Sequence, residues 1–535
     1  MKKRNYLYVA AVAGVLLLGV LIRVMHFPGL PPGFNQDEAA SAYESYALAE
    51  TGHDKWGNLL PAYFPAWGSG QNVLLAYLLV PVIKVFGLSI FSARLVPLGL
   101  GLLTLPLLFY CLRPAGRWPA LLATLLLALA PWHFMQSRWA LESNLVPFFM
   151  LLGCTLLSRA LITQRRCWIL PALVPFALSL YAYGTTVLVL PGLLGLVGAL
   201  GWRQLLPHWR SWLVALGLFL LLAAPFLLFF TENYLLGRNL AWTDGLFFAT
   251  PLLPATRASQ VAGAPLADLL AHNLRFLVAG CDDGTSYNVL AGFKPLLSPA
   301  LPFALVAVLV GLWQLVRQRG QVFYSAHNIV LVVLAAWGVA ACALFFTIDL
   351  NVNRFNHFYV PCLALAAWAM AATISSFQPS VPRPLLRLAV VGWLMLEGGL
   401  AVRSYFTTYA QGPIRSDFNE GLGEAFGAVA GLWGLNQVRI TTQMPLPYVY
   451  ALFYLRYPPA QFQREARVRV VDGTYQVRRF GRYIFTDDEL VAGQPYAYLA
   501  RKGELADTAE RHREVVFTND SWEVGIMQPG AAARP

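Results

Sequence analysis

Long stretches without a single charged side chain recur along roughly the first 400 residues of this chain. Two of them, "LVPLGLGLLTLPLLFYCL" from Leu95 and "WPALLATLLLALAPWHFM" from Trp118, each run for 18 residues. A helix of about 20 apolar residues spans the hydrocarbon core of a bilayer. Charged residues make up 12% of the chain, about half the share in soluble domains, and the mean hydropathy is +0.55. The sequence therefore predicts a polytopic α-helical membrane protein.

The apolar runs predict about 11 transmembrane helices. They are expected at 6–25, 95–112, 117–134, 144–162, 168–183, 185–201, 211–230, 298–316, 327–347, 357–376 and 387–403. With the N-terminus inside, every inner loop carries arginine or lysine and no acidic residue. Because positive residues stay on the cytoplasmic side, this bias predicts a bacterial plasma-membrane protein with a cytoplasmic N-terminus.

The basic loops also account for the net charge of +12 without nucleic acid as a partner. The six cysteines include no CxxC pair, so the sequence indicates neither a zinc knuckle nor a disulfide framework.

One further apolar segment, "NVLLAYLLVPVIKVFG" (72–87), is predicted not to cross the bilayer. If it crossed, all later arginine-bearing loops would face outward, against the positive-inside bias. It is therefore expected to lie along the membrane surface. The first outer loop then extends over about 26–94, and a second large outer loop covers about 231–297.

The last segment of the chain differs in character. After about residue 403 the apolar runs stop, and "VRITTQ" and "YQVRRFGRYIF" alternate as strands do, while "NEGLGEAFGAVAGLWG" is typical of a helix. We expect a membrane module over 1–403 and a small extracytoplasmic α/β domain over 404–535.

Polar residues suited to chemistry collect at the predicted outer ends of the spans. They are Asp37, Glu38, Arg94, Arg138, Glu142, Tyr181, Tyr183, Arg354 and His357. Arginine binds phosphate bidentately, and a nearby carboxylate can accept the proton of a hydroxyl group. Because nucleotide sugars are cytosolic, this combination suits sugar transfer from a lipid-linked phosphate on the outer face.

Each candidate also has a structural interpretation. Asp37 and Glu38 could cap the helix "EAASAYESYALAE", and a carboxylate such as Glu142 also suits a helix N-terminus. The arginines could anchor helix ends at the interface, and the two tyrosines could belong to an aromatic belt.

Several segments occur in a distinctive order over roughly residues 1–400. They are "PPGFNQDEA", "FGLSIFSARLVPLGLGLLTLPLLFY", "LALAPWHFMQSRWALESNLVPFFML", "ALSLYAYGTT" and "NRFNHFYVPCLALAA". Their order resembles the membrane-embedded GT-C glycosyltransferases. More narrowly, it resembles the bacterial family 39 type relatives of protein O-mannosyltransferases and of the lipid A aminoarabinose transferase.

The resemblance implies a GT-C fold and an inverting transfer from a polyprenyl-phosphate sugar to a protein, lipid or glycan acceptor. Asp37 matches the family's catalytic carboxylate, with Glu38 as its neighbour. Glu38 and Glu142 are then expected to orient the acceptor, whereas Arg94, Arg138 and Arg354 are expected to hold the donor phosphate. Tyr181, Tyr183 and His357 complete the predicted substrate-binding set.

Two points stay open at this stage. The family has metal-using and metal-independent members, so no cofactor is predicted, although a divalent metal at Asp37 and Glu38 is compatible with the resemblance. Relatives often carry a Lys-Pro-Pro-like stretch where this chain has "SGQNVLLAY", so Arg94 or Arg354 is expected to replace that lysine.

The alternative function is a transporter or flippase of a lipid-linked saccharide. It would use the same arginines for phosphate but would need no base. Such a protein is expected to carry charged residues through its spans, and most spans here are uncharged.

Overall fold

The computed structural model describes residues 2–66, 70–243, 245–255, 265–317, 325–377, 382–471, 473–491, 493–505 and 511–529. The chain forms two compact units, each assembled from three separate segments. Unit 1 comprises Met1–Phe27, Pro97–Leu227 and Gly263–Tyr409. Unit 2 comprises Pro28–Val96, Leu228–Ala262 and Ala410–Pro535.

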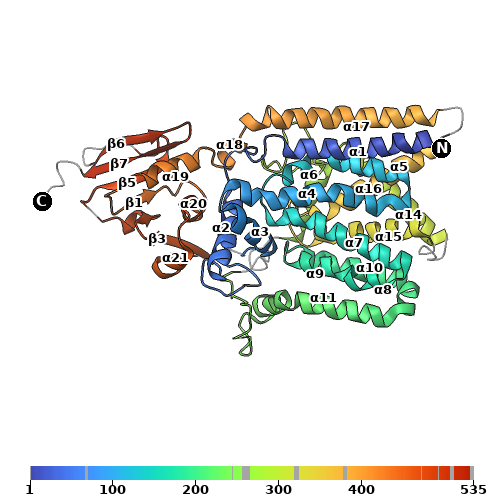
Figure 1. The fold of residues 1–535 in the computed structure, drawn as a ribbon, viewed down its shortest axis with the longest axis horizontal. Coiled ribbons are helices and arrows are strands. Elements are labelled where there is room, and N and C mark those ends of the chain that lie inside the picture. The colour runs from blue at the N-terminus through green and yellow to red at the C-terminus, as the bar shows by residue number, and fades with distance from the viewer. Residues whose placement is uncertain are drawn as a thin grey trace. The chain divides into compact units, whose positions relative to one another are not determined.

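Unit 1 consists mainly of apolar helices, most of them long, that lie side by side (Figure 1). They are α1 (Lys2–Val24), most of α4 (Ile90–Leu112), α5 (Arg117–Leu129), α7 (Val146–Thr163), α8 (Arg166–Ile169), α9 (Val174–Leu180), α10 (Thr186–Leu205), α11 (Trp209–Phe230), α14 (Ala300–Arg317), α15 (Ala326–Cys342), α16 (Asn356–Ser376) and α17 (Arg383–Phe406). Helices suit these runs because a bilayer offers no water to satisfy backbone N–H and C=O groups.

Within the described residues, seven helical segments are long and apolar enough to cross a membrane. One of them, Thr186–Leu236, contains both α10 and α11. Four shorter apolar helices cover Leu74–Phe86, Arg117–Leu129, Arg166–Leu180 and Ala300–Gln314. Each predicted span coincides with a helix from one of these two groups, whereas the total of 11 crossings stays a prediction.

The predicted span 117–134 is not one continuous helix. Helix α5 ends at Leu129, and a separate short helix, α6 (Pro131–Gln136), follows it. Proline has no N–H to continue the ladder of α5, but it suits the first position of a new helix. Pro131 therefore divides the segment.

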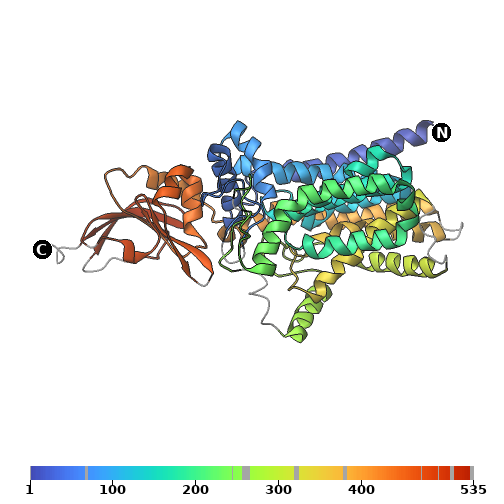
Figure 2. The same ribbon diagram turned by 90° about the horizontal axis from the view of Figure 1, so that it is seen from below.

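Unit 2 contains a seven-stranded sheet and the helices beside it, drawn in orange and red in Figure 2. The strand order is β2-β3-β4-β1-β5-β7-β6. The strands are β1 (Val438–Ile440), β2 (Arg467–Val471), β3 (Thr474–Phe480), β4 (Tyr483–Ile484), β5 (Tyr496–Arg501), β6 (Arg511–Thr518) and β7 (Trp522–Pro529). Strand β1 pairs in parallel with β4 and β5, and the other pairs are antiparallel. The predicted C-terminal sheet domain is thus confirmed.

The residues of the predicted first outer loop belong to this same unit. They form α2 (Gln36–Thr51) and α3 (Leu74–Phe86), and α2 packs against α20 (Pro447–Tyr454) and α21 (Pro459–Glu465). The Tyr43 hydroxyl donates to the carbonyl of Tyr457 at 2.8 Å, and the rings of Phe34 and Phe453 lie 4.5 Å apart. The C-terminal residues therefore form part of the core that surrounds α2.

Candidate active site

The start of α2 is fixed by a capping box. Asn35 has extended backbone angles, and its side-chain oxygen accepts the N–H of Asp37 at 2.9 Å. The Glu38 carboxylate in turn accepts the N–H of Asn35 at 3.2 Å. The sequence "NQDE" has the spacing that this motif requires, so the residues themselves place the predicted acidic pair in the first turn of α2.

Glu38 forms a fully buried, bidentate ion pair with Arg94. Its two carboxylate oxygens accept from Nε and Nη2 of Arg94 at 2.8 and 2.7 Å, and neither side chain is exposed. Such fork-to-fork geometry is stronger and more directional than a single hydrogen bond. The structure thus brings together two predicted site residues that lie 56 positions apart.

The other N–H groups of Arg94 bind the backbone that leads into α2. Nη1 donates to the carbonyls of Pro28 and Pro31 at 2.6 and 2.8 Å, and Nη2 also donates to that of Gly33 at 2.9 Å. All five guanidinium donors therefore have protein acceptors. The predicted phosphate contact of Arg94 would require breaking one of these bonds, and the geometry favours a positioning role for Arg94 and Glu38.

Asp37 differs from Glu38 in its surroundings. It is partly exposed, whereas Glu38 is fully buried. Its helix packs against α20, where burial, Tyr454 and the Asp37 charge together raise the pKa of Tyr450. Asp37 is thus an accessible carboxylate on a helix turn that its neighbours hold rigidly.

A metal ion shared by Asp37 and Glu38 does not fit this arrangement. Both Glu38 oxygens already accept hydrogen bonds from Arg94. Across the described part of the chain, no three His, Cys, Asp or Glu side chains cluster in a way that could hold a metal ion.

In unit 1, Arg138 makes contacts typical of a helix anchor. It is fully buried, and it donates to the carbonyls of Ile22, Arg23 and Met25 at 3.1, 2.7 and 2.7 Å. These carbonyls end α1, where a cation also complements the helix dipole. The guanidinium further lies 5.5 Å from the centre of the Tyr405 ring.

Tyr181 and His357 also make contacts between helices. The Tyr181 hydroxyl donates to the carbonyl of Leu222 at 2.7 Å and accepts the N–H of Phe226 at 3.1 Å. His357 Nε2 lies 3.2 Å from the Thr186 hydroxyl.

Glu142 and Tyr183 are buried as well. Glu142 is the first residue of the short 3₁₀ helix Glu142–Leu145. This agrees with its structural interpretation as a carboxylate at a helix N-terminus. Arg138, Glu142, Tyr181, Tyr183, Arg354 and His357 thus lie in unit 1, apart in sequence from the Asp37 group of unit 2.

Arg354 is the one predicted phosphate-binding arginine in the described chain that is partly exposed. Its Nη1 donates to the carbonyl of Asp349 at 2.9 Å. Its Nε and Nη2 make no hydrogen bond to any described residue, so they are available to an anion. Arg354 can therefore bind a phosphate through these two nitrogens, whereas Arg94 would first have to break a hydrogen bond to the protein.

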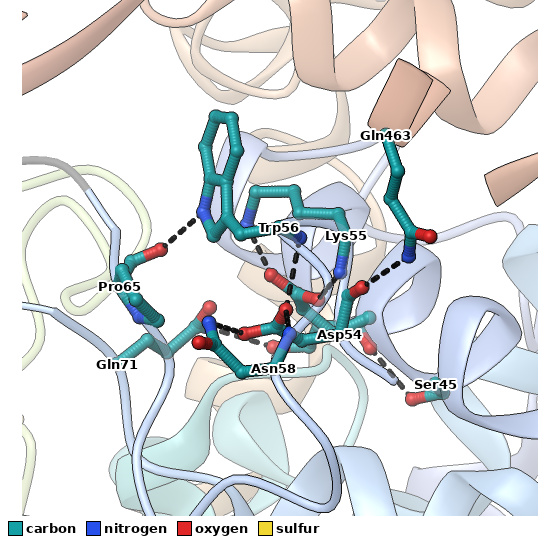
Figure 3. Close-up of polar contacts among 10 residues, drawn as sticks. Ser45, Asp54, Lys55, Trp56, Asn58, Pro65, Gln71 and Gln463 are labelled. Atoms are coloured by element: carbon teal, nitrogen blue, oxygen red, sulfur yellow. Dashed lines mark hydrogen bonds and ion pairs between the residues drawn. The ribbon is translucent and has the colours of Figure 1, made fainter. Parts of the chain in front are cut away.

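A buried charged network in α2 and the following loop was not predicted from the sequence (Figure 3). Glu44 and Lys55 form an ion pair, and the Lys55 N–H also donates to Glu44 at 2.9 Å. The Asp54 carboxylate accepts the backbone N–H groups of Trp56 and Asn58 at 2.9 and 2.8 Å. Glu44, Asp54 and Lys55 are all essentially inaccessible.

This network joins α2 to the C-terminal residues of unit 2. Gln463 donates to the carbonyl of Asp54 at 2.8 Å, and the Trp56 ring stacks on Tyr475 at 5.0 Å (Figure 3 shows Gln463 and Trp56). The sequence indicates the turn but not the network, because "DKWGN" has the Asp, Gly and Asn that turns favour. Together, the network and the Glu38–Arg94 pair fix α2 along its length.

The stability of unit 2 is predicted to depend on pH through Glu44. Burial raises the pKa of Glu44 from 4.5 to about 7, although Lys55 opposes the shift. Because the folded state binds this proton more tightly than the unfolded chain, the unfolding free energy should fall as the pH rises from 4.5 to about 7. In thermal unfolding experiments in detergent, the stability of Glu44→Gln should decrease less with rising pH than that of the wild type. A matched change at the exposed Glu50, Glu50→Gln, should leave the profile unchanged, and identical profiles for all three proteins would contradict this assignment.

Comparison with known proteins gives one partial family match and several structures with a similar fold. Residues 71–229 match the family described as dolichyl-phosphate-mannose-protein mannosyltransferase. The fold is similar to that of ArnT from Cupriavidus metallidurans in the apo state, with a TM-score of 0.57, 15% identity and 100% coverage of both chains. ArnT from the same organism bound to undecaprenyl phosphate gives the same TM-score, with 14% identity and 100% coverage of both chains. No curated protein matches the sequence significantly.

The family match and the shared fold agree with the resemblance that the ordered motifs indicated. Over residues 71–229 the chain is similar to the protein O-mannosyltransferase family, and its fold is similar to that of ArnT.

Proposed function

We propose that this protein is an inverting glycosyltransferase. It takes a sugar from a polyprenyl-phosphate donor on the extracytoplasmic face of a bacterial plasma membrane and transfers it to an acceptor hydroxyl. The observation that carries the proposal is Asp37, an accessible carboxylate in the first turn of α2, beside a Glu38 that is held by Arg94. The fold shared with an ArnT structure that binds undecaprenyl phosphate supports the choice of donor.

In the proposed reaction, the Asp37 carboxylate accepts the proton of the acceptor hydroxyl. The hydroxyl oxygen attacks the anomeric carbon of the sugar. The bond from that carbon to the phosphate oxygen breaks, and the polyprenyl phosphate leaves with the electron pair. Because the attack is in line, the configuration at the anomeric carbon inverts.

The phosphate contact is assigned to Arg354, and Arg94 and Glu38 are assigned to positioning Asp37. Glu142 remains the proposed acceptor contact, and Tyr183 remains a proposed substrate contact. The buried contacts of Arg138, Tyr181 and His357 support roles in holding the bundle.

Arg354→Met is expected to lower kcat/KM for the donor by about 10–100-fold, since a hydrogen bond to a charged group contributes roughly 1.5–3 kcal/mol. Arg354→Lys should lose less, because it retains the charge but not the planar fork. Initial rates against donor concentration measure both effects. Arg403→Met, a change at an exposed arginine of the same unit, serves as the control, and an equal loss in that variant would remove the assignment.

The stereochemistry of the product tests the reaction itself. A simple alcohol such as methanol can replace the natural acceptor, and NMR then gives the anomeric configuration of the resulting glycoside. We expect the configuration opposite to that of the donor. A product with the donor's configuration would rule out single-step attack assisted by Asp37.

A further inference from the structure

We propose that a groove in unit 1 binds an acyl chain of an anionic phospholipid at the basic end of the helical bundle. A cavity of about 240 Å³ lies among α10, α14, α15 and α16. Its lining is almost entirely apolar and includes Leu200, Val308, Leu331 and Leu365. This site is separate from the residues proposed for sugar transfer.

The packing of the helices leaves this groove open. Helix α15 packs against α10 and α16, and α14 packs against α16, so α10 and α14 flank the cavity. Gly311 of α14 lines it, and a methyl group added there would meet no atom within 4 Å. An apolar cavity of this kind excludes water, and protein interiors avoid such voids. Within a bilayer, the apolar material at hand is a lipid chain.

Aromatic and basic residues indicate where a lipid headgroup would lie. Three exposed tryptophans pack beside arginines at this end of the bundle: Trp202 with Arg203, Trp209 with Arg210, and Trp313 with Arg317. Tryptophan concentrates at the level of lipid headgroups, and arginine extends towards it. Two side-chain amides line the groove: Gln314 follows Trp313 directly, and Asn328 lies in the first turn of α15, next to the basic connection 317–326.

The positive charge at this end of the bundle favours a lipid with an anionic headgroup. The connections 202–210 and 317–326 contain arginines and no acidic residue, and clustered arginines between membrane helices attract anionic headgroups. By the predicted topology, this end of the bundle faces the cytoplasm.

The polyprenyl-phosphate donor is a poorer candidate for the groove. Arg354 precedes the first turn of α16, and Leu365 lies 11 positions later. At a rise of 1.5 Å per residue, the two are about 16 Å apart along the helix. The groove lining on α16 therefore lies about 16 Å along the helix from the proposed donor phosphate.

Native mass spectrometry of the full-length protein, titrated with phosphatidylglycerol or phosphatidylcholine, tests this site. We expect the wild type to bind phosphatidylglycerol at least 10-fold more tightly than phosphatidylcholine. Gly311→Leu should fill the groove and lower the affinity for both lipids about 10-fold. Gly195→Leu, at an exposed glycine of α10 outside the lining, is the matched control and should bind as the wild type does.

A second variant keeps the test independent of folding. Arg317→Gln should lose the preference for phosphatidylglycerol while still binding both lipids, because the groove itself is unchanged. Equal binding of the two lipids by the wild type, or undiminished phosphatidylglycerol binding by Gly311→Leu, would overturn the proposal. Displacement of phosphatidylglycerol by undecaprenyl phosphate would also overturn it, by assigning the groove to the carrier lipid. None of these outcomes depends on glycosyltransferase activity.

Discussion

Replacing Asp37 by asparagine is expected to lower the rate of sugar transfer by about 10²–10⁴-fold, the usual contribution of general-base catalysis. Asparagine cannot accept the proton of the acceptor hydroxyl. The start of α2 should survive the change, because Asn35 binds the backbone N–H of residue 37 and not its side chain. Steady-state rates with a polyprenyl-phosphate sugar measure the effect, and donor binding should be retained.

Glu50→Gln provides the matched control for this experiment. Glu50 lies on the same helix as Asp37 and is exposed, so its neutralisation should leave the rate unchanged. If pure Asp37→Asn protein transferred sugar at the wild-type rate, Asp37 would not be the base.

Arg94→Met is expected to lower the unfolding free energy by about 3–5 kcal/mol, because it leaves the Glu38 carboxylate buried without its cation. It also removes the donors for the carbonyls of Pro28, Pro31 and Gly33. Chemical denaturation in detergent measures the change. The double variant Glu38→Met/Arg94→Met should recover part of the loss, since it buries no unpaired charge.

This pair of variants also separates two roles for Arg94. If Arg94 only positions α2, the loss of activity should follow the loss of folded protein, and the double variant should recover part of both. If Arg94→Met retained wild-type stability but bound the donor weakly, Arg94 would contact the phosphate directly, as the sequence predicted.

Much of the fold was predictable because hydropathy acts locally. Each apolar run is helical, and the strands of "VRITTQ" and "YQVRRFGRYIF" appear as β1, β3 and β4. The break after Leu129 was missed, because Pro131 lies within a run whose hydropathy does not change. An average of hydropathy over many residues does not register that Pro131 lacks a backbone N–H.

The candidate site was predictable only in part. The spacing of "NQDE" places Asp37 and Glu38 at a helix start, but it does not indicate which of the two is accessible. That difference depends on Arg94, which lies 56 positions after Glu38. Likewise, the segment around Lys55 is typical of a solvated loop. Gln463, which lies 409 positions after Asp54, donates to the Asp54 carbonyl and helps to cover this loop. Such long-range contacts leave no local pattern in one sequence.

The most direct test of the proposed function is turnover of a lipid-linked sugar by the purified protein. The protein, in nanodiscs, is incubated with a small panel of polyprenyl-phosphate sugars, and mass spectrometry follows release of the polyprenyl phosphate. We expect at least one donor to be consumed by the wild type and to persist with Asp37→Asn. If every donor stayed intact while vesicles containing the protein moved a lipid-linked sugar across the bilayer, the protein would be a transporter and not a transferase.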